Sequence, residues 1–129
     1  MSRWYVDTSA ALKLLADEPE SAALAAAVDE EEPELLASLL LETELRRAAH
    51  RDEALDQQLV SRFLEGVSLY EMPPSVFREA GLLPGRRLRS LDALHLATAI
   101  RLQADGLLTY DLRMADAASE FGVPVLAPG

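Results

Sequence analysis

The hydrophobic and polar positions of this chain form short apolar runs that alternate with longer helical stripes. The run Trp4-Tyr5-Val6 is rich in aromatic and β-branched residues, which favours a buried strand. Residues 20–28 are mostly strong helix formers. The pattern predicts five strands, at residues 3–7, 35–37, 67–72, 107–109 and 123–126. It predicts helices at residues 10–16, 20–28, 39–50, 53–65, 76–83, 90–100 and 114–121.

Strands that alternate with helices indicate an α/β fold with a mostly parallel sheet and right-handed crossovers. A chain of 129 residues can form one self-sufficient core, so we expect a single domain over residues 1–129. The acidic run at residues 29–34 is expected to be a solvated loop.

The segment from Ser90 to Ile100 is apolar around nearly its whole circumference, which predicts a buried helix. Ser90 is the predicted N-cap, and this places Asp92 at the second helical position, near the positive end of the helix dipole. His95 follows Asp92 by three residues and can face the same opening. A core or interface histidine is the simpler interpretation, and a general acid is the alternative.

The net charge of −10 arises from one segment, because residues 17–44 contain ten acids and no Lys or Arg. Such a protein does not bind nucleic acid by bulk attraction, so a metal or local arginines would have to supply it. The absence of cysteine excludes disulfides and thiolate metal sites. No uncharged run approaches the roughly 18 residues of a membrane span, and Asp7 stands where a signal peptide would be apolar. We therefore expect a cytoplasmic protein.

Two aspartates, Asp7 and Asp111, each come directly after a predicted strand. In an open parallel sheet, ligands bind beyond the carboxyl ends of the strands, where the strand order reverses. Either residue could instead cap the following helix. Thr8 or Ser9 could cap the first helix as well, which would leave Asp7 free for another role.

A glutamate on the helix at residues 39–50 is a further candidate. Glu42 lies three residues before Leu45, at the border of the apolar stripe. The alternative is an exposed pair with Arg46, which would contribute only about 0.2–0.5 kcal/mol. Glu44 is expected to face the surface and to pair with Arg47.

Four carboxylates in one pocket would repel one another and raise their pKa values unless a cation offsets the charge. The candidates are Asp7, Glu42, Asp92 and Asp111. Oxygen ligands without cysteine suit Mg²⁺ or Mn²⁺ better than Zn²⁺. A cation held in this way suits phosphodiester hydrolysis.

Four blocks of the sequence carry a family resemblance: Tyr5-Val6-Asp7-Thr8-Ser9-Ala10, Glu42-Thr43-Glu44-Leu45, Ser90-Leu91-Asp92-Ala93-Leu94-His95-Leu96-Ala97-Thr98-Ala99 and Leu108-Thr109-Tyr110-Asp111. In this order and chain length they resemble the PIN-domain family, specifically the VapC-like toxins of bacterial and archaeal toxin–antitoxin pairs. The resemblance implies a three-layer α/β/α fold with a five-stranded sheet in the order 3-2-1-4-5. It also implies that Asp7, Glu42, Asp92 and Asp111 form a Mg²⁺- or Mn²⁺-binding active site.

The activity implied by the resemblance is metal-dependent endoribonucleolytic cleavage of structured RNA, such as transfer or ribosomal RNA, which arrests translation. The implied partners are a VapB-like antitoxin, the RNA substrate and a second copy of the chain in a homodimer. Thr8, Ser9 and Thr109 could orient a metal-bound water. Asp116 is either a further acid near the pocket or a first-turn dipole residue. RNA phosphates or antitoxin carboxylates could be held by Arg46, Arg86, Arg87, Arg89 and Arg113, which could equally balance the acids of the pocket.

Three other interpretations were weighed. A phosphoacceptor receiver domain also has an acidic pocket on a parallel sheet, but it needs a lysine after a late strand, and the only lysine is Lys13. An RNA-processing nuclease with the same fold that is not a toxin remains an alternative. A catalytically silent PIN-like domain that binds a protein is another, although all four acidic positions are occupied.

Overall fold

The computed structural model describes all residues, 1–129, and contains one parallel five-stranded sheet in the order β3-β2-β1-β4-β5. This confirms the α/β class and the strand order implied by the resemblance. β1 pairs with both β2 and β4, so the strand order reverses beside the central strand. The strands are β1 (Arg3–Val6), β2 (Glu34–Ser38), β3 (Val67–Tyr70), β4 (Gly106–Leu108) and β5 (Val125–Leu126).

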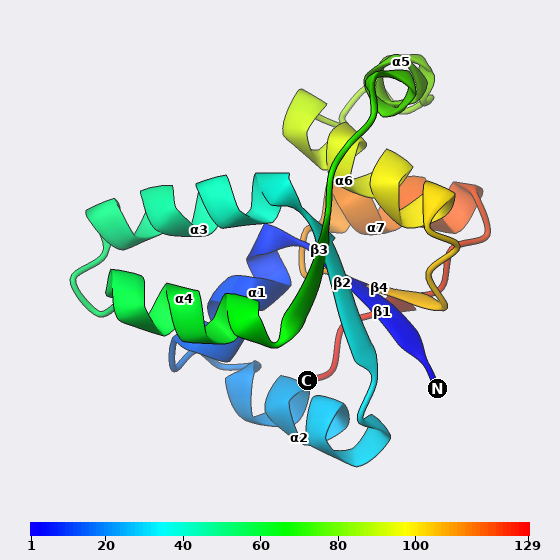
Figure 1. The fold of residues 1–129 in the computed structure, drawn as a ribbon. Coiled ribbons are helices and arrows are strands. Elements are labelled where there is room, and N and C mark those ends of the chain that lie inside the picture. Colours follow the sequence, from blue (N-terminus) through cyan, green and yellow to red (C-terminus); the bar gives the residue numbers. More distant parts are fainter.

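Helices cover both faces of the sheet and make three layers. Figure 1 shows α1, α3 and α4 on one side, and α6 and α7 on the other. None of the helices combines the length and the apolar character needed to cross a bilayer. The helices are α1 (Thr8–Leu15), α2 (Ser21–Glu31), α3 (Leu39–Arg51), α4 (Gln57–Glu65), α5 (Pro74–Leu82), α6 (Ser90–Arg101) and α7 (Leu112–Glu120).

Successive strand residues supply the two halves of the core, because side chains alternate across a sheet. Tyr5 and Leu107 pack in the cluster that includes residues of α6 and α7. Their neighbours Val6 and Leu108 pack in the cluster that includes residues of α1, α3 and α4. All four are fully buried, so β1 and β4 are held rigidly where they end.

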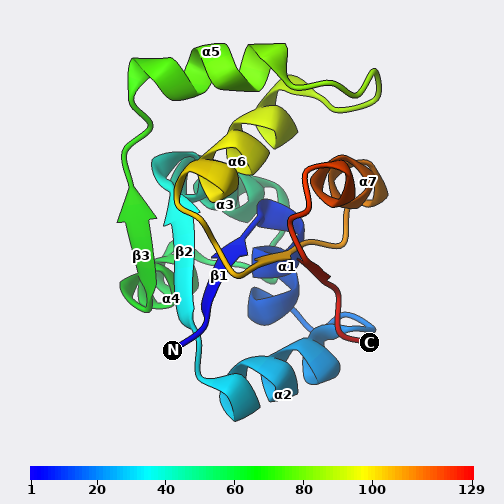
Figure 2. The same cartoon turned by 90° about the vertical axis from the view of Figure 1, so that its right-hand side faces the viewer.

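The predicted central helix is α6, and it is buried as expected. One side faces the sheet, and another packs against α5, which lies over it in Figure 2. Its N-terminus differs from the prediction. Arg89, with extended backbone angles (φ −82°, ψ 164°), occupies the N-cap position without a side-chain cap, and Ser90 is already helical. Asp92 is therefore the third helical residue, still in the first turn.

Two further boundary predictions were wrong. Asp29 to Glu31 form the last turn of α2 instead of a loop, and the helix ends at Glu32, which has a left-handed backbone (φ 49°). The helix predicted at residues 53–65 begins only at Gln57. Asp56 accepts a hydrogen bond from the backbone N–H of Leu59 and so caps α4 four residues later than expected.

Candidate active site

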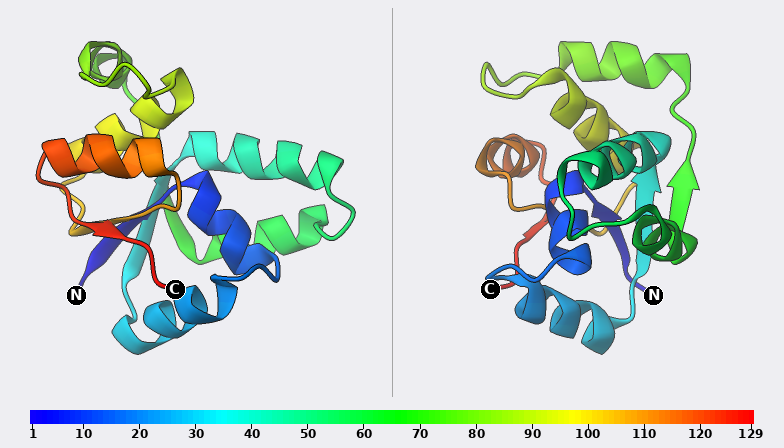
Figure 3. Two further views of the ribbon diagram at one scale, coloured as in Figure 1. Left: turned by 180° about the vertical axis from the view of Figure 1, so that it is seen from behind. Right: turned by 90° about the vertical axis from the view of Figure 1, so that its left-hand side faces the viewer.

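A polar pocket of about 250 Å³ opens at the carboxyl ends of β1 and β4. Figure 3 shows the N-terminal ends of α1, α3 and α7 coming together in this region. This is the position where the strand order reverses, so the fold itself places a ligand site there. The lining residues are Asp7, Thr8, Ser9, Leu12, Glu44, Asp92, His95 and Asp111.

Asp7 lies at the floor of the pocket and is only 3% exposed. Its Oδ1 accepts hydrogen bonds from the Ser9 hydroxyl (2.7 Å) and the Ala10 amide (3.0 Å), and its Oδ2 accepts one from the Thr109 hydroxyl. Asp7 is therefore the N-cap of α1, and the expectation that Thr8 or Ser9 caps this helix was wrong. Burial raises the pKa of Asp7, and these hydrogen bonds offset part of the rise.

Ser9 and Thr109 join the two strand ends around Asp7. Ser9 Oγ accepts a hydrogen bond from the Tyr110 amide (2.9 Å), and Thr109 Oγ1 accepts one from the Asp111 amide (3.1 Å). Each hydroxyl thus donates to Asp7 and accepts from the backbone that follows β4. The two residues position the carboxylate of Asp7 relative to the loop that carries Asp111.

Asp111 and Asp92 form the opposite wall. Asp111 caps α7, accepting hydrogen bonds from the amides of Arg113 (2.9 Å) and Met114 (3.2 Å). Asp92 has no hydrogen-bonded cap role, and its side chain is 21% exposed. Partial burial and the nearby charge of Asp111 raise the pKa of Asp92, while Arg89 acts in the opposite direction. The negative charges of this wall therefore repel one another.

The fourth acid of the pocket is Glu44, which the sequence had placed at the surface. Its Oε1 lies 2.7 Å from the Thr8 hydroxyl and 2.5 Å from His95 Nε2, and its side chain is 22% exposed. Burial acts to raise the pKa of Glu44, but the hydrogen bonds from His95 and Thr8 outweigh it. The pKa therefore lies below its ordinary value, and the carboxylate is kept ionised.

Glu42 lies outside the pocket, so the prediction that it joins the three aspartates was wrong. Its carboxylate pairs with Arg46 Nε at 2.9 Å, and Arg46 also donates hydrogen bonds to Gln57 and Ser61 of the α4 side. This is the i, i+4 pair that was the alternative interpretation. Arg46 consequently faces α4 and does not line the pocket.

The remaining candidates are divided between the pocket and its surroundings. His95 lines the pocket and is buried. Asp116 lies in the middle of α7, beyond its first turn, and lines a neighbouring cavity of about 190 Å³, so both earlier interpretations of it were wrong. The arginines of this second cavity are Arg86, Arg87 and Arg113. Arg89 and Arg113 approach Asp92 and Asp111 at 3.9 Å and 4.0 Å.

The pocket acids fit a divalent cation in donor chemistry and in charge. Their donors are carboxylate oxygens, and the raised pKa of Asp92 reflects negative charges that a cation would offset. The structure holds no group of three or more acids or histidines already arranged to hold a metal ion. One oxygen of Asp7 and one of Asp111 accept hydrogen bonds from amides at the starts of α1 and α7. A bound cation would therefore require small side-chain adjustments.

Comparison with known proteins identifies the family. The PIN domain model matches residues 4–120. Ribonuclease VapC46 of Mycobacterium tuberculosis is 40% identical over 130 residues, covering 99% of both chains. The structure of VapBC2 from Rickettsia felis, bound to a DNA fragment from its promoter, has a TM-score of 0.74 at 12% identity and covers 98% of this chain and 99% of that chain.

A third similar protein is VapC20 of Mycobacterium tuberculosis, described as a sarcin–ricin loop cleaving toxin. Its TM-score is 0.67 at 14% identity, over 88% of this chain and 94% of that chain. At such identities the structures establish the fold alone, whereas the family model and VapC46 establish kinship. Nucleases of this family generally use divalent metal ions. The chain belongs to the PIN-domain family and has the VapC ribonucleases among its relatives.

Proposed function

We propose that this protein is a Mg²⁺- or Mn²⁺-dependent endoribonuclease that acts as the toxin of a VapBC-type pair. The observation that carries the proposal is the pocket in which Asp7, Glu44, Asp92 and Asp111 meet at the reversal of strand order. The relative named ribonuclease VapC46 supports the reaction class. The VapBC2 complex supports the antitoxin partner.

The chain's own residues account for the site as follows. Asp7, Asp92 and Asp111 supply the carboxylates that would hold the cation, and Ser9 and Thr109 fix the orientation of Asp7. Glu44 stands across the pocket with its charge retained. A divalent cation in such a site lowers the pKa of water and offsets the charge of a phosphodiester.

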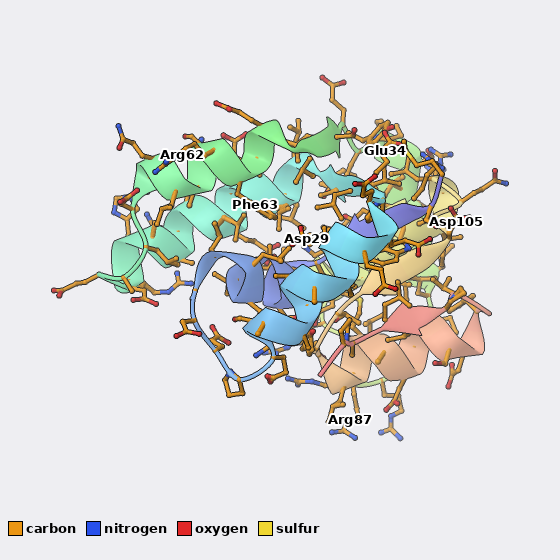
Figure 4. The ribbon with its side chains drawn as sticks, turned by 90° about the horizontal axis from the view of Figure 1, so that it is seen from below. Asp29, Glu34, Arg62, Phe63, Arg87 and Asp105 are labelled. Atoms are coloured by element: carbon orange, nitrogen blue, oxygen red, sulfur yellow. The ribbon has the colours of Figure 1, made fainter.

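Arginines beside the pocket support RNA as the substrate. Because the net charge is −10, the attraction for phosphates must be local. Arg86, Arg87 and Arg113 line the adjoining cavity, and Arg89 stands beside Asp92. Figure 4 shows Arg87 extending outward beside α7, while Arg62 extends from α4 on the other side of the molecule. We propose that this cluster, and not Arg46, contacts the RNA backbone.

The arginine proposal can be tested with an inactive Asp92→Asn background, in which RNA binds without being cut. Arg87→Gln should weaken RNA binding and lower the salt dependence of the binding constant by about one counterion. Arg62→Gln removes the same charge far from the pocket and should leave both unchanged. Equal effects of the two variants, measured by fluorescence anisotropy, would rule out a local phosphate contact.

A groove next to the pocket supports the antitoxin partner. It runs between α1 and α3, shares Thr8, Leu12 and Glu44 with the pocket, and has Arg47 and Arg51 among its lining residues. A VapB-like segment bound there would close the entrance to the acids. The homodimer implied by the resemblance stays a prediction, which sedimentation of the purified protein would test.

The decisive experiment is cleavage of structured RNA, with a sarcin–ricin loop RNA and a transfer RNA as probes. We expect cleavage with Mg²⁺ or Mn²⁺, none with chelator, and a loss of about 100-fold or more in Asp7→Asn and Asp92→Asn. Glu44→Gln should also lose activity, whereas Glu42→Gln, two residues away, should keep it. Cleavage that persists in chelator and in both aspartate variants would contradict the proposed site.

Expression in bacteria separates the toxin from the alternatives. A toxin expressed without its antitoxin should arrest translation, and Asp92→Asn should abolish the arrest. An RNA-processing nuclease would cleave RNA in vitro without this arrest, and a silent protein-binding domain would do neither.

A further inference from the structure

His95 joins the three elements that carry the pocket acids. It is 1% exposed and lies on α6 three residues after Asp92, so the two side chains share a face of the helix. Its ring lies between Tyr5 of β1 and Glu44 of α3. The proposed reaction has not yet assigned a part to this histidine.

Both ring nitrogens of His95 have partners. Nε2 lies 2.5 Å from Glu44 Oε1, and Nδ1 lies 2.8 Å from the Tyr5 hydroxyl. An ionised carboxylate only accepts hydrogen bonds, so Nε2 must carry a hydrogen and donate it to Glu44. In the neutral ring, Nδ1 then accepts from the Tyr5 hydroxyl. The two bonds together fix the tautomer and the orientation of the ring.

The Tyr5 hydroxyl is well suited to hold the far side of the ring. Tyr5 is fully buried on β1, two residues before Asp7, and its ring meets His95 edge-on with centroids 5.8 Å apart. Burial raises the pKa of Tyr5 well above its ordinary value, so the hydroxyl keeps its hydrogen. A chain of donors thus runs from Tyr5 through His95 to Glu44.

The hydrogen bonds to Glu44 are concentrated on one of its oxygens. Thr8 and His95 both donate to Oε1. Oε2 is left without a protein hydrogen-bond partner in a side chain that lines the pocket. A glutamate on a helix surface would otherwise sample several rotamers. Two donors on one oxygen select a single arrangement.

We propose that His95 is a positioning residue, held by Tyr5, that fixes Glu44 with one oxygen bound and the other available to the pocket. The proposal rests on the proposed nuclease function for its activity readout only. Outer residues that orient metal ligands typically contribute 10- to 100-fold to metal affinity or activity. We expect an effect in this range from His95.

The first test observes the tautomer directly and needs neither metal nor substrate. Nitrogen-15 NMR of the histidine ring should show His95 with its hydrogen on Nε2. Glu44→Gln should shift the Nε2 signal strongly, and Glu42→Gln should leave it unchanged. A ring protonated on Nδ1 alone, or an equal response to both variants, would overturn the proposal whether or not the protein cleaves RNA.

The second test is a double-mutant cycle between His95 and Glu44, followed by kcat, KM and Mn²⁺ affinity from calorimetry. His95→Leu should lower kcat and Mn²⁺ affinity 10- to 100-fold with little change in KM, and should add nothing in the Glu44→Gln background. His95→Gln, which keeps a donor, should restore part of the loss. Additive effects would indicate a merely structural histidine and overturn the proposal.

Tyr5→Phe provides a milder variant if His95→Leu does not fold. It removes only the hydroxyl that holds Nδ1, and its melting curve shows whether the fold is intact. A smaller loss in kcat than that of His95→Leu, absent in the Glu44→Gln background, is expected. A Tyr5→Phe protein with wild-type kcat, Mn²⁺ affinity and ring signal would show that Tyr5 does not hold the histidine.

Discussion

Two glutamates separated by one residue have different environments on α3. Residues two positions apart differ by about 200° around a helix. The buried stripe of α3 contains Leu41, Leu45 and Ala48. Glu42 borders it on the side of α4, where Arg46 binds it, and Glu44 borders it on the side of α1 and α6. Periodicity places both glutamates at a border, and only the packing of α3 decides which border faces the pocket.

The raised pKa of Asp92 predicts how stability depends on pH in the metal-free protein. An aspartate whose pKa is higher in the folded than in the unfolded state binds protons more tightly when folded. Its contribution to the free energy of unfolding therefore falls as the pH rises from about 3.9, the unfolded value, through the raised folded value. Asp92→Asn should stabilise the chelator-treated protein at pH 7, and the gain should shrink towards pH 4.

Urea unfolding at several pH values would measure this gain. Asp17→Asn, which removes one exposed charge between α1 and α2, controls for the change in net charge. Glu44 has the opposite sign, since its lowered pKa contributes stability that is lost as the pH falls. The comparison must therefore be made between variant and wild type at each pH. A gain that is constant with pH would contradict repulsion at Asp92.

At the scale of elements, the pocket is built from the ends of strands and the starts of helices. Asp7 ends β1 and caps α1, and Asp111 follows β4 and caps α7. The same carboxylates thus satisfy backbone N–H groups and line the pocket. Capping and site functions had been treated as alternatives in the sequence, whereas in the structure each aspartate combines both.

The strand that leads to Asp111 depends on a close approach at Gly106. A Cβ at this position would lie 2.7 Å from Leu126 Cδ1 of β5 and 3.5 Å from Trp4 of β1. Gly106→Ala should therefore force Leu126 to move and lower the free energy of unfolding by about 1–3 kcal/mol. Chemical denaturation would measure the loss.

Gly81, near the end of α5, provides the matched control for this substitution. A Cβ there meets nothing within 4 Å, and alanine is the better helix former. Gly81→Ala should raise the free energy of unfolding by up to about 1 kcal/mol. If both variants shift stability in the same direction, the close packing of β4 against β5 is not what makes Gly106 necessary.

At the scale of the whole molecule, charge separates the body from the region around the pocket. The segment 17–44 carries ten acids without a base, although its helix α2 lies away from the pocket acids. The arginines Arg86, Arg87, Arg89 and Arg113 gather near Asp92 and Asp111. The net charge of the chain therefore says little about what approaches the pocket, because local charge decides it.

The convergence of acids predicts that a divalent cation stabilises the fold. At about 100 times its dissociation constant, Mn²⁺ should add roughly 2.7 kcal/mol. In a chain of this size that would raise Tm by roughly 10 °C. Asp92→Asn should reduce the rise, and Asp17→Asn should keep it. Melting curves that do not respond to Mn²⁺ in any of these proteins would contradict a cation site among the acids.

The order of the elements and the α/β class could be derived from the amino-acid sequence, because apolar periodicity and strand-ending residues are local properties. Asp7, Asp92 and Asp111 could be found for the same reason: each lies at the end of a strand or in the first turn of a helix. Boundaries such as the start of α4 were missed where a single capping aspartate, Asp56, decides them.

Other features depend on contacts between residues far apart in the chain. The choice of Glu44 over Glu42 follows from how α3 packs against α1, α4 and α6. The partnership of His95 with Tyr5 spans 90 residues, and no local pattern encodes it. Rotation of a helix about its axis is set by the surfaces on both of its sides. Only the tertiary structure therefore decided which side chains complete the pocket.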